Sequence, residues 1–303
     1  MKPMLKYSLK LVAILCVFTP FNSMHAADSS NGQNTKKAEL LFQLHRPLVI
    51  GHRGFSILAP ENTLPSFHDA VLAGADMVEL DYHHTKEGVP IVCHDPEVDR
   101  TTNAREKWNA QHIKISDRTV EELQSLEAGL NAHPPISGVR LPLLSQALDE
   151  IQKGSVTLIE RKAGEPATCI RLLKEKNLLN EVVVQSFDWA YLEQFHKEEP
   201  SQILGALGPI NTLHGRRLTK EEHALSPEFN DEIKRIGARA AVWNRQVSRE
   251  AIDDAHKKGL QVWVYTIDDP AVANELLDMG VDGIITNNTS IIWKALALRT
   301  ASK

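Results

Sequence analysis

The sequence is poor in cysteine and has no apolar run long enough to cross a membrane. Its three cysteines among 303 residues include Cys16 in the N-terminal leader, so a processed chain keeps only Cys93 and Cys169. Two cysteines cannot form a disulfide framework. We expect two buried thiols, with a single bridge as the alternative. The apolar run at residues 11–18 is shorter than the roughly 20 residues that span a bilayer.

Excess positive charge is also absent. The chain has 34 Lys and Arg against 39 Asp and Glu, a net charge of −5, and no basic stripe. This balance argues against a nucleic-acid partner, since such proteins carry a basic face. No G-x-G-x-x-G follows the first predicted strand and no G-x-S-x-G occurs, which argues against a dinucleotide fold and a serine hydrolase. A small anionic substrate would need only a few well-placed basic residues.

The N-terminus has the order of a secretory signal peptide. Lysines at positions 2, 6 and 10 precede the apolar run, and Ala26 and Ala27 follow it. We predict a signal peptide at residues 1–27, a polar segment at 28–45 and one domain at 46–303. The protein is then periplasmic or secreted, with no stable membrane anchor after cleavage.

From residue 47 onward, short apolar runs alternate with segments of helical spacing, such as 246–258 and 270–279. This rhythm predicts an α/β fold, a TIM-type (β/α)₈ barrel, with a doubly wound sheet as the alternative. The predicted strands lie at 48–52, 77–81, 90–94, 156–160, 182–187, 203–207, 239–243, 261–266 and 282–286.

Nine runs compete for the eight places in such a barrel. One solution is a hairpin within 77–94, because the link there is too short for a parallel crossover. A two-residue loop at Glu87 and Gly88 would place Asp81 opposite His94. The other solution leaves 239–243 outside the barrel wall.

Three acids lie in or at the ends of predicted strands, namely Glu79, Asp81 and Glu160. Polar side chains at the C-terminal strand ends build the site in such barrels. Carboxylates gathered there repel one another unless a cation lies between them. Ca²⁺ or Mg²⁺ suits an all-oxygen set, whereas zinc prefers nitrogen or sulfur. Ion pairs with nearby basic residues are the alternative for each acid taken singly.

Two histidines and two basic residues lie at the same predicted ends. His52 and His94 could divide proton transfer between them near neutral pH, although a single histidine there is more often a packed core residue. Arg53 and Lys162 add fixed positive charge, which suits a phosphate group in its transition state. Together these residues favour phosphodiester cleavage. The pair His83 and His84 is interpreted as solvated, and Trp243, Trp263 and Tyr265 mainly as packing residues.

The motifs that carry this chemistry resemble those of the glycerophosphodiester phosphodiesterase family, from about residue 48 to 290. They are GHRGFSILAPENTLPSF, GADMVELDYHHTKEGVPIVCHDPEVDRTTN, LIERK, VVVQSFDW, VWVYTIDD and GVDGIIT. The resemblance implies a TIM-type barrel that hydrolyses glycerophosphodiesters to sn-glycerol 3-phosphate and an alcohol, with Ca²⁺ or Mg²⁺. It also implies that the substrate's neighbouring hydroxyl attacks phosphorus, giving a cyclic phosphate that water opens.

The resemblance also implies roles for single residues. His52 and His94 match the general acid/base pair and Arg53 and Lys162 the phosphate contacts. The metal ligands would be Glu79, Asp81 and Glu160. Glu61 matches a residue near the metal, either a further ligand or a support behind the ligands, and Asn62 would cap the following helix.

Three positions depart from the family pattern. Arg161 replaces a usually aliphatic residue, and we expect it to point toward the helices and find an acidic partner. Thr286-Asn287-Asn288-Thr289 replaces a usual Thr-Asp-x-Pro, which affects the last loop. The segment 101–142 is short, so the head-group preference does not follow from the family.

Three other functions remain open at this point. They are a phospholipase D-like activity on lysophospholipids, a lyase that stops at the cyclic phosphate, and a barrel that binds a ligand without catalysis.

Overall fold

The structure is a computed structural model, which describes residues 37–130, 132 and 134–301. The predicted signal peptide at residues 1–27 and the polar stretch that follows it as far as residue 36 lie outside the described residues. The described residues all belong to one compact unit. None of the described helices has the length and apolar character needed to cross a membrane.

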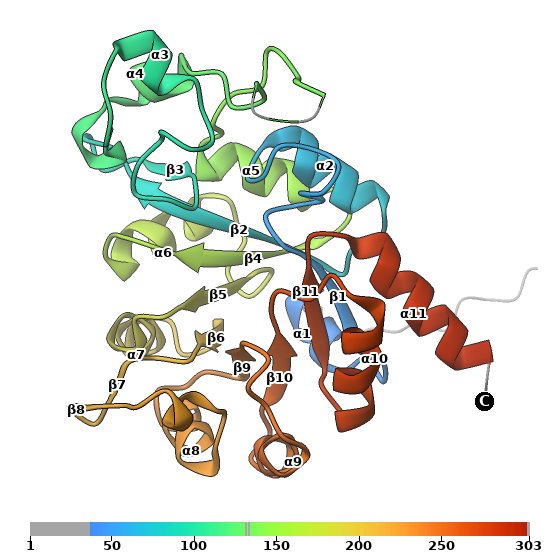
Figure 1. Cartoon of the computed structure of the whole chain (residues 1–303). Helices are drawn as coiled ribbons and strands as arrows, with labels where there is room; N and C mark the ends of the chain where they lie inside the picture. Colours follow the sequence, from blue (N-terminus) through green and yellow to red (C-terminus); the bar gives the residue numbers. More distant parts are fainter. Residues whose placement is uncertain (1–36, 131, 133, 302–303) are drawn as a thin grey trace, which may run out of the picture. The chain divides into compact units, whose positions relative to one another are not determined.

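Eight parallel strands close into a barrel, because β1 pairs with both β2 and β11 (Figure 1). The TIM-type fold is therefore confirmed, and the alternative that leaves residues 239–243 outside the wall is wrong. The barrel strands are β1 (Leu48–Gly51), β2 (Met77–His84), β4 (Val156–Arg161), β5 (Val183–Ser186), β6 (Ile203–Leu207), β9 (Ala240–Trp243), β10 (Gln261–Val264) and β11 (Gly283–Thr286).

A helix follows each barrel strand and covers its outer face. The covering helices are α2 (Leu64–Leu72), α5 (Leu144–Ile151), α6 (Pro166–Glu175), α7 (Trp189–Glu198), α8 (Pro227–Arg235), α9 (Arg249–Lys257), α10 (Pro270–Met279) and α11 (Thr289–Ala301). Several begin where a side-chain oxygen accepts a hydrogen bond from a backbone N–H of the first turn, which satisfies an otherwise unpaired donor. These N-caps are Thr63, Asp188, Ser226, Ser248 and Asp269.

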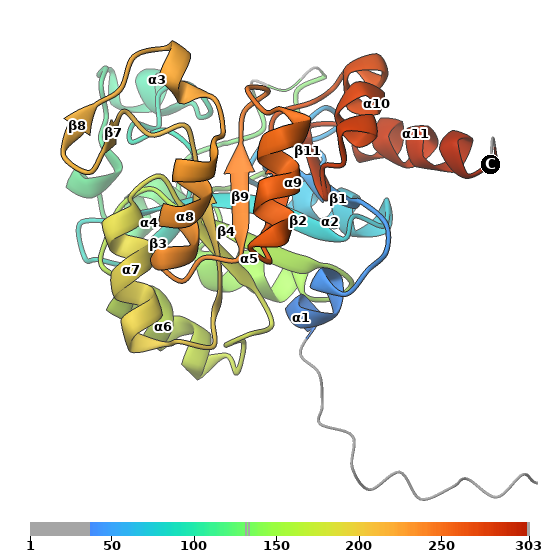
Figure 2. The same ribbon diagram turned by 90° about the horizontal axis from the view of Figure 1, so that it is seen from below.

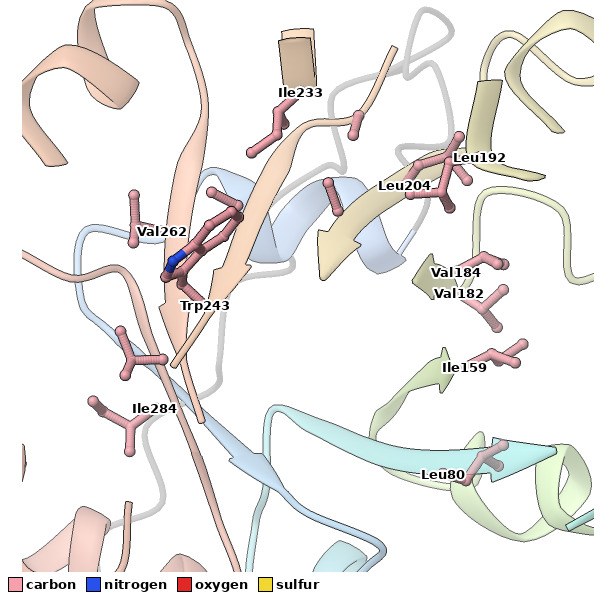
Figure 3. Packing of buried hydrophobic residues seen from close by; sticks show 14 of the residues in the cluster. Leu80, Ile159, Val182, Val184, Leu192, Leu204, Ile233, Trp243, Val262 and Ile284 are labelled. Atoms are coloured by element: carbon pink, nitrogen blue, oxygen red, sulfur yellow. The ribbon is translucent and has the colours of Figure 1, made fainter. Parts of the chain in front are cut away.

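Alternate residues of each strand face two separate cores, because side chains point to opposite faces of a strand in turn. One core lies between the strands and the helices and includes Leu80, Ile159, Val184, Leu204, Val262 and Ile284 (Figure 3). The other fills the barrel lumen and includes Leu48, Met77, Val156, Leu158, Ile203 and Trp263. Trp243 and Trp263 are fully buried packing residues, as the sequence predicts. Tyr265, interpreted with them mainly as a packing residue, is only partly buried against the lumen core and also lines a cavity.

The short helix α1 (Lys37–Phe42) packs against the lumen core. Ala38 is fully buried in that core, and the ring of Phe42 lies 5.6 Å from that of Trp263. Glu39 forms an ion pair with Arg239, which precedes β9. In Figure 2, the arrow of β9 points away from the end at which α1 lies. Helix α1 therefore closes the N-terminal end of the barrel.

The ninth predicted strand forms a hairpin with β2. Strand β3 (Pro90–Val92) pairs antiparallel with β2, with His84 opposite Pro90 and Tyr82 opposite Val92. The predicted hairpin is confirmed, but its register is wrong by one residue. Thr85 N–H donates to the Val89 carbonyl at 3.0 Å, which makes a three-residue loop ending at Gly88, whose φ of 78° is left-handed. Asp81 is therefore opposite Cys93, whose N–H donates to the Asp81 carbonyl at 3.0 Å.

The two histidines after Tyr82 extend strand β2. His83 is buried, and its Nε2 lies 3.1 Å from the His94 carbonyl, while the His84 ring stacks on Tyr82. The interpretation of this pair as solvated is wrong, because pairing with β3 continues strand β2 as far as His84.

The chain between β3 and α5 forms a small lobe with a core of its own. It contains α3 (Ala104–Trp108), the 3₁₀ turn η1 (Ile115–Asp117) and α4 (Val120–Gln124), and lies beside β3 in Figure 1. A second addition between β6 and α8 contains the strands β7 (Thr212–Leu213) and β8 (Arg216–Arg217), which pair antiparallel, and the 3₁₀ turn η2 (Glu221–His223). The first of these two segments, the lobe between β3 and α5, has a core that comprises residues such as Ile91, Val98, Ile115, Leu123, Leu126 and Leu141.

Both cysteines of the described chain are free thiols, so the alternative of a bridge is wrong. Burial raises the pKa of Cys93 and of Cys169 to about 12. Neither thiol is therefore a nucleophile near neutral pH.

Candidate active site

A sharp turn directly after β1 sets two of the predicted site residues at the C-terminal rim of the barrel. His52 N–H donates to the Thr286 carbonyl at 2.8 Å, which continues the pairing of β1 with β11. Arg53 and Gly54 then take left-handed φ values of 56° and 91°. A Cβ on Gly54 would lie 2.6 Å from the backbone of Ser66, so only glycine allows α2 to pack this close.

Three carboxylates meet on the lumen side of β2 and β4. Asp81 lies directly beside Glu160 in the parallel register, and Glu79 is two residues before Asp81 on the same face. One oxygen of each of the three lies within 4.8 Å of the others. Their exposed fractions are 1%, 1% and 6% for Glu79, Asp81 and Glu160.

Two basic side chains lie against this trio and set its charge. Lys162 Nζ is 3.0 Å from Asp81 Oδ1 and also pairs with Glu160. Arg53 Nε is 3.5 Å from Asp81 Oδ2, and the Arg53 backbone N–H donates to Glu79 Oε2 at 2.8 Å. Two cations therefore face three acids, which leaves an excess of negative charge when all three are ionised.

This imbalance separates the pKa values of the trio. Burial raises the pKa of Glu160 to about 7, with a further contribution from Asp81. Burial and both neighbouring acids hold the pKa of Glu79 well above its usual range. Burial acts in the same direction on Asp81, but Lys162 and Arg53 outweigh it and lower the pKa. A divalent cation among the three would remove the repulsion, and all three ligands are the hard oxygens that Ca²⁺ and Mg²⁺ prefer.

His52 is oriented by two residues from the last two loops of the barrel. Its Nδ1 lies 2.8 Å from Asn287 Oδ1. The Asn287 backbone N–H and its Nδ2 donate to the two oxygens of Asp268 at 2.8 and 2.7 Å. A carboxylate only accepts, so it fixes the amide with Oδ1 toward His52, which puts the proton on Nδ1. Burial and the adjacent Arg53 lower the pKa of His52, and the neutral ring then has a free acceptor at Nε2.

His94 has a different partner. Its Nδ1 lies 2.7 Å from Asp95 Oδ1. Arg100 donates from Nε to Asp95 at 2.6 Å and from Nη1 and Nη2 to Glu61 at 2.8 Å each. Partial burial opposes ionisation of Asp95, but hydrogen bonds from Arg100 and His94 lower its pKa to about 2. Asp95 is therefore a carboxylate at neutral pH and accepts a hydrogen bond from His94 Nδ1, which fixes the orientation of the ring.

Glu61 lies outside the carboxylate trio. Its Oε1 accepts from Arg53 Nη1 at 2.8 Å and from Arg100 Nη2, and its Oε2 accepts from Arg100 Nη1. Of the two roles predicted for Glu61, the contacts correspond to support behind the ligands. Glu61 and Arg100 thereby connect Arg53 on one strand end to His94 on another.

Asn62 is a site residue that sequence reasoning misassigned. The cap of α2 is Thr63. Asn62 is buried, with φ at 58°, and its Nδ2 donates to Asp81 Oδ2 at 2.8 Å while its Oδ1 accepts from the Asp81 backbone N–H at 3.2 Å. The amide therefore fixes the orientation of one carboxylate of the trio.

The predicted residues converge on one cavity of about 200 Å³ at the C-terminal rim. Six of the eight predicted site residues line it, while Asp81 lies in the adjoining trio and Glu61 behind Arg53. Arg161 points away, as predicted, and pairs with Asp188 at 2.9 Å. The charged wall of the cavity consists of His52, Arg53, Glu79, His94, Glu160 and Lys162, and the remaining wall of Gln185, Phe187, Leu207, Tyr265, Thr266 and Ile285.

Comparison with known proteins agrees with this constellation. Residues 52–291 match the model of the glycerophosphoryl diester phosphodiesterase family. The chain belongs to this family. Its site residues all lie within the matched range, as does the lobe between β3 and α5.

Bacterial members of the family cover nearly the same length. A glycerophosphodiester phosphodiesterase of Caldanaerobacter subterraneus subsp. tengcongensis is 31% identical over 80% of this chain and 95% of its own. One from Bacillus subtilis is 30% identical over 82% of this chain and 86% of its own.

Solved structures share the barrel at lower identity. An Oleispira antarctica phosphodiesterase, solved in complex with the product sn-glycerol-3-phosphate, matches with a TM-score of 0.71 and 24% identity, over 83% of this chain and 97% of its own. A glycerophosphodiester phosphodiesterase from Agrobacterium tumefaciens matches with a TM-score of 0.66 and 24% identity, over 81% of this chain and 98% of its own. Family and buried trio together indicate a site for a divalent cation.

Proposed function

We propose that this chain hydrolyses glycerophosphodiesters to sn-glycerol 3-phosphate and an alcohol. One observation carries the proposal. His52 and His94 face a single cavity with their Nδ1 atoms already paired, beside three buried carboxylates and two basic groups.

The two histidines have complementary proton functions. The neutral Nε2 of His52 accepts a proton from the attacking hydroxyl or water as its oxygen bonds to phosphorus. His94, oriented by its Nδ1 contact with Asp95, is the general acid of the proposal and donates a proton from Nε2 to the leaving alkoxide as the phosphorus–oxygen bond breaks. If the attacking group is a substrate hydroxyl, the first product is a cyclic phosphate and the two roles then reverse. Neutral His94 accepts a proton from water as its oxygen bonds to phosphorus, and protonated His52 returns its proton to the hydroxyl that is released.

Arg53 and Lys162 hold the phosphate. Both already contact carboxylates, so they are kept in position by fixed negative charge rather than by the substrate. Positive groups positioned in advance stabilise the additional charge of the transition state at little reorganisation cost.

The cation that we assign to the trio is Ca²⁺ or Mg²⁺. Glu79, Asp81 and Glu160 would hold it. When bound, it supplies Lewis-acid polarisation of a phosphoryl oxygen. The donor set fits such an ion because it consists of carboxylate oxygens alone and carries excess negative charge.

The test is release of glycerol 3-phosphate from glycerophosphocholine. Chelation with EDTA should abolish it, and Ca²⁺ or Mg²⁺ added back should restore it. His52→Ala should lower the rate at least about 100-fold, whereas His68→Ala, an exposed histidine paired with Glu150, should leave it unchanged. Normal turnover by His52→Ala would refute the proposal. Phosphorus NMR separates the open monoester from a lyase that stops at the cyclic phosphate.

A second cavity supports lysophospholipids as a second substrate class. This cavity has a volume of about 500 Å³ and lies beside the active site, because Glu61, which contacts Arg53, is part of its wall. Other residues of the wall include Ile57, Leu58, Pro60, Arg100 and Thr101. Ile57 and Leu58 are 57% and 66% exposed, so an acyl chain could cover them. Choline release from lysophosphatidylcholine should fall in Leu58→Ser while that from glycerophosphocholine is kept. Equal loss of both would remove this candidate.

We also propose that the protein is exported to the periplasm or the medium. The order of lysines, apolar run and small residues before residue 28 supports this. N-terminal sequencing of the exported protein should find a start near Asp28.

A further inference from the structure

The wall of the active-site cavity contains a polar side chain that the proposed mechanism does not use. Gln185 lies on the lumen side of β5, directly beside Glu160 in the register with β4. Its side chain is almost fully buried, at 1% exposure, and Oε1 has no hydrogen-bond partner among the described residues. A buried amide left unpaired is costly, because it loses its bonds to water and gains none in return.

A second buried glutamine shows how the same side chain is satisfied elsewhere in this barrel. Gln202 precedes β6 at the opposite end and is 2% exposed. Its Nε2 donates to the Val182 carbonyl at 2.6 Å, and its Oε1 accepts from Asn180 N–H at 3.0 Å. Gln202 therefore serves the fold, whereas Gln185 presents its amide to a cavity.

The surroundings of Gln185 limit what it could bind. The same cavity is lined by Phe187, Tyr265 and Ile285, which offer carbon surface and suit C–H groups. Gly205 on the next strand lets the Gln185 side chain pack closely, since a Cβ there would lie 3.4 Å from Gln185 Cβ and 3.1 Å from the Val242 side chain. Arg53 and Lys162, which suit the phosphate, lie in the charged wall of the same cavity. The ligand group at Gln185 is therefore neutral, hydrogen-bonding and carried on carbon.

We propose that Gln185 binds a hydroxyl of the glycerol unit and makes the site selective for polyol phosphodiesters. This inference rests on the proposed function and names the part of the substrate that the amide recognises. A hydroxyl both donates and accepts, so it can pair with the amide in either orientation. The apolar wall then packs against the carbon chain of the same unit.

The test compares binding of ligands that differ by one hydroxyl. Calorimetric titrations of the full-length protein with Ca²⁺ would use sn-glycerol 3-phosphate, the phosphate monoesters of propane-1,2-diol and propane-1,3-diol, and inorganic phosphate. Gln185→Leu, which keeps the shape and removes the amide, should weaken sn-glycerol 3-phosphate about tenfold, the scale of one hydrogen bond. Inorganic phosphate should bind as before.

The two diol phosphates show which hydroxyl of the glycerol unit Gln185 binds. The one that lacks the bound hydroxyl should bind the wild-type protein about tenfold more weakly than sn-glycerol 3-phosphate and should not respond to Gln185→Leu. Equal weakening of every ligand, or of none, would overturn the inference. Weaker Ca²⁺ binding by Gln185→Leu would also overturn it, because the amide would then serve the ion.

Thermal unfolding provides the control for folding. Gln185→Leu should not lower Tm, since no protein hydrogen bond is lost, whereas Gln202→Leu should lower it. Should Gln185→Leu nonetheless unfold, the titrations are repeated with Gln185→Met, which also has an uncharged side chain.

Glycerophosphocholine hydrolysis by the wild-type protein is measured in parallel. An inactive wild type refutes the proposed function, while an active one with unchanged binding by the variant refutes only the role of Gln185.

Discussion

The two ends of the barrel lumen differ in chemistry although they lie on the same strands. We call the N-terminal end of the lumen the lower end and its C-terminal end the upper end. On β2, Met77 fills the lower lumen, and Glu79, two residues further on the same face, is a buried acid of the upper lumen. On β4, Leu158 packs in the lumen core and Glu160 joins the trio. The lower end gains free energy from apolar burial, whereas the upper end buries like charges, which costs free energy unless a cation is present.

This difference separates stability from function within one structure. The lower lumen is closed by α1 and holds the strands in place. The strands, held in place at the lower end, keep the three carboxylates of the upper lumen close together although they repel one another. Mutations at the two ends should therefore have opposite consequences.

The largest effect should come from Glu79→Gln at the upper end. The amide keeps the shape but removes one charge of the trio, so kcat/KM for glycerophosphocholine should fall about 10³-fold. The Tm of the metal-free protein should stay the same or rise, because repulsion of Asp81 and Glu160 is relieved. Glu106→Gln, on α3, provides the control in both measurements. A large drop in Tm with activity retained would contradict the comparison.

Ile203→Ala at the lower end should have the reverse effect. Ile203 is 1% exposed and packs in the lumen core. Its truncation should cost about 2–5 kcal/mol in the free energy of unfolding, measured by urea denaturation. At temperatures well below Tm the variant should keep the wild-type kcat. Loss of kcat in the folded variant would show that the two ends are coupled.

The contribution of Glu160 to the stability of the metal-free protein should fall as pH rises from 5 to 8, so the wild type should lose stability relative to Glu160→Gln over this range. Burial and Asp81 raise the pKa of Glu160 from 4.5 to about 7 in the folded protein. The resulting stability is therefore complete below the unfolded pKa and lost as pH rises through the folded one. The loss is on the order of 3 kcal/mol for Glu160. Ca²⁺ should raise Tm strongly at pH 8 and little at pH 5, where protons compete for the ligands. A difference in Tm between wild type and Glu160→Gln in EDTA that does not change over this range would contradict the charge imbalance at the upper end.

The smallest effect should come from Asn62→Gly. Glycine tolerates the left-handed φ of this residue and removes the amide that orients Asp81. The affinity for Ca²⁺, measured calorimetrically, should fall about 10- to 100-fold, as for other residues that orient metal ligands. Asn109→Gly is the matched control, since Asn109 also has a left-handed φ, at 46°, and ends α3 far from β2 in sequence. Equal affinity in both variants would show that Asp81 is oriented without Asn62.

The strand order and the carboxylate trio could be predicted because both depend on local pattern. Apolar runs give the strands, and polar residues two apart on a strand share a face. The hairpin register could not be predicted, because loops of two and three residues fit the stretch around Gly88 equally well. The contacts of Asn62 and Asn287 were also missed. Their partners, Asp81 and Asp268, are 19 residues away in each case, and only the closed barrel brings them together.

Gln185 was missed for a different reason. A single glutamine in the apolar run before Phe187 has no spacing that marks it. Its importance depends on an absent partner, which only the coordinates of its neighbours reveal.

Helix α1 closes the N-terminal end of the barrel, so the active site opens to solvent at the C-terminal rim. Because Phe42 and Ala38 seal the floor, ion, substrate and product must all pass through the same mouth. The trio is more deeply buried than His94 at the rim. Bound product would block the path of the ion. The rate at which a chelator removes the ion should therefore be limited by the dissociation rate of glycerol 3-phosphate.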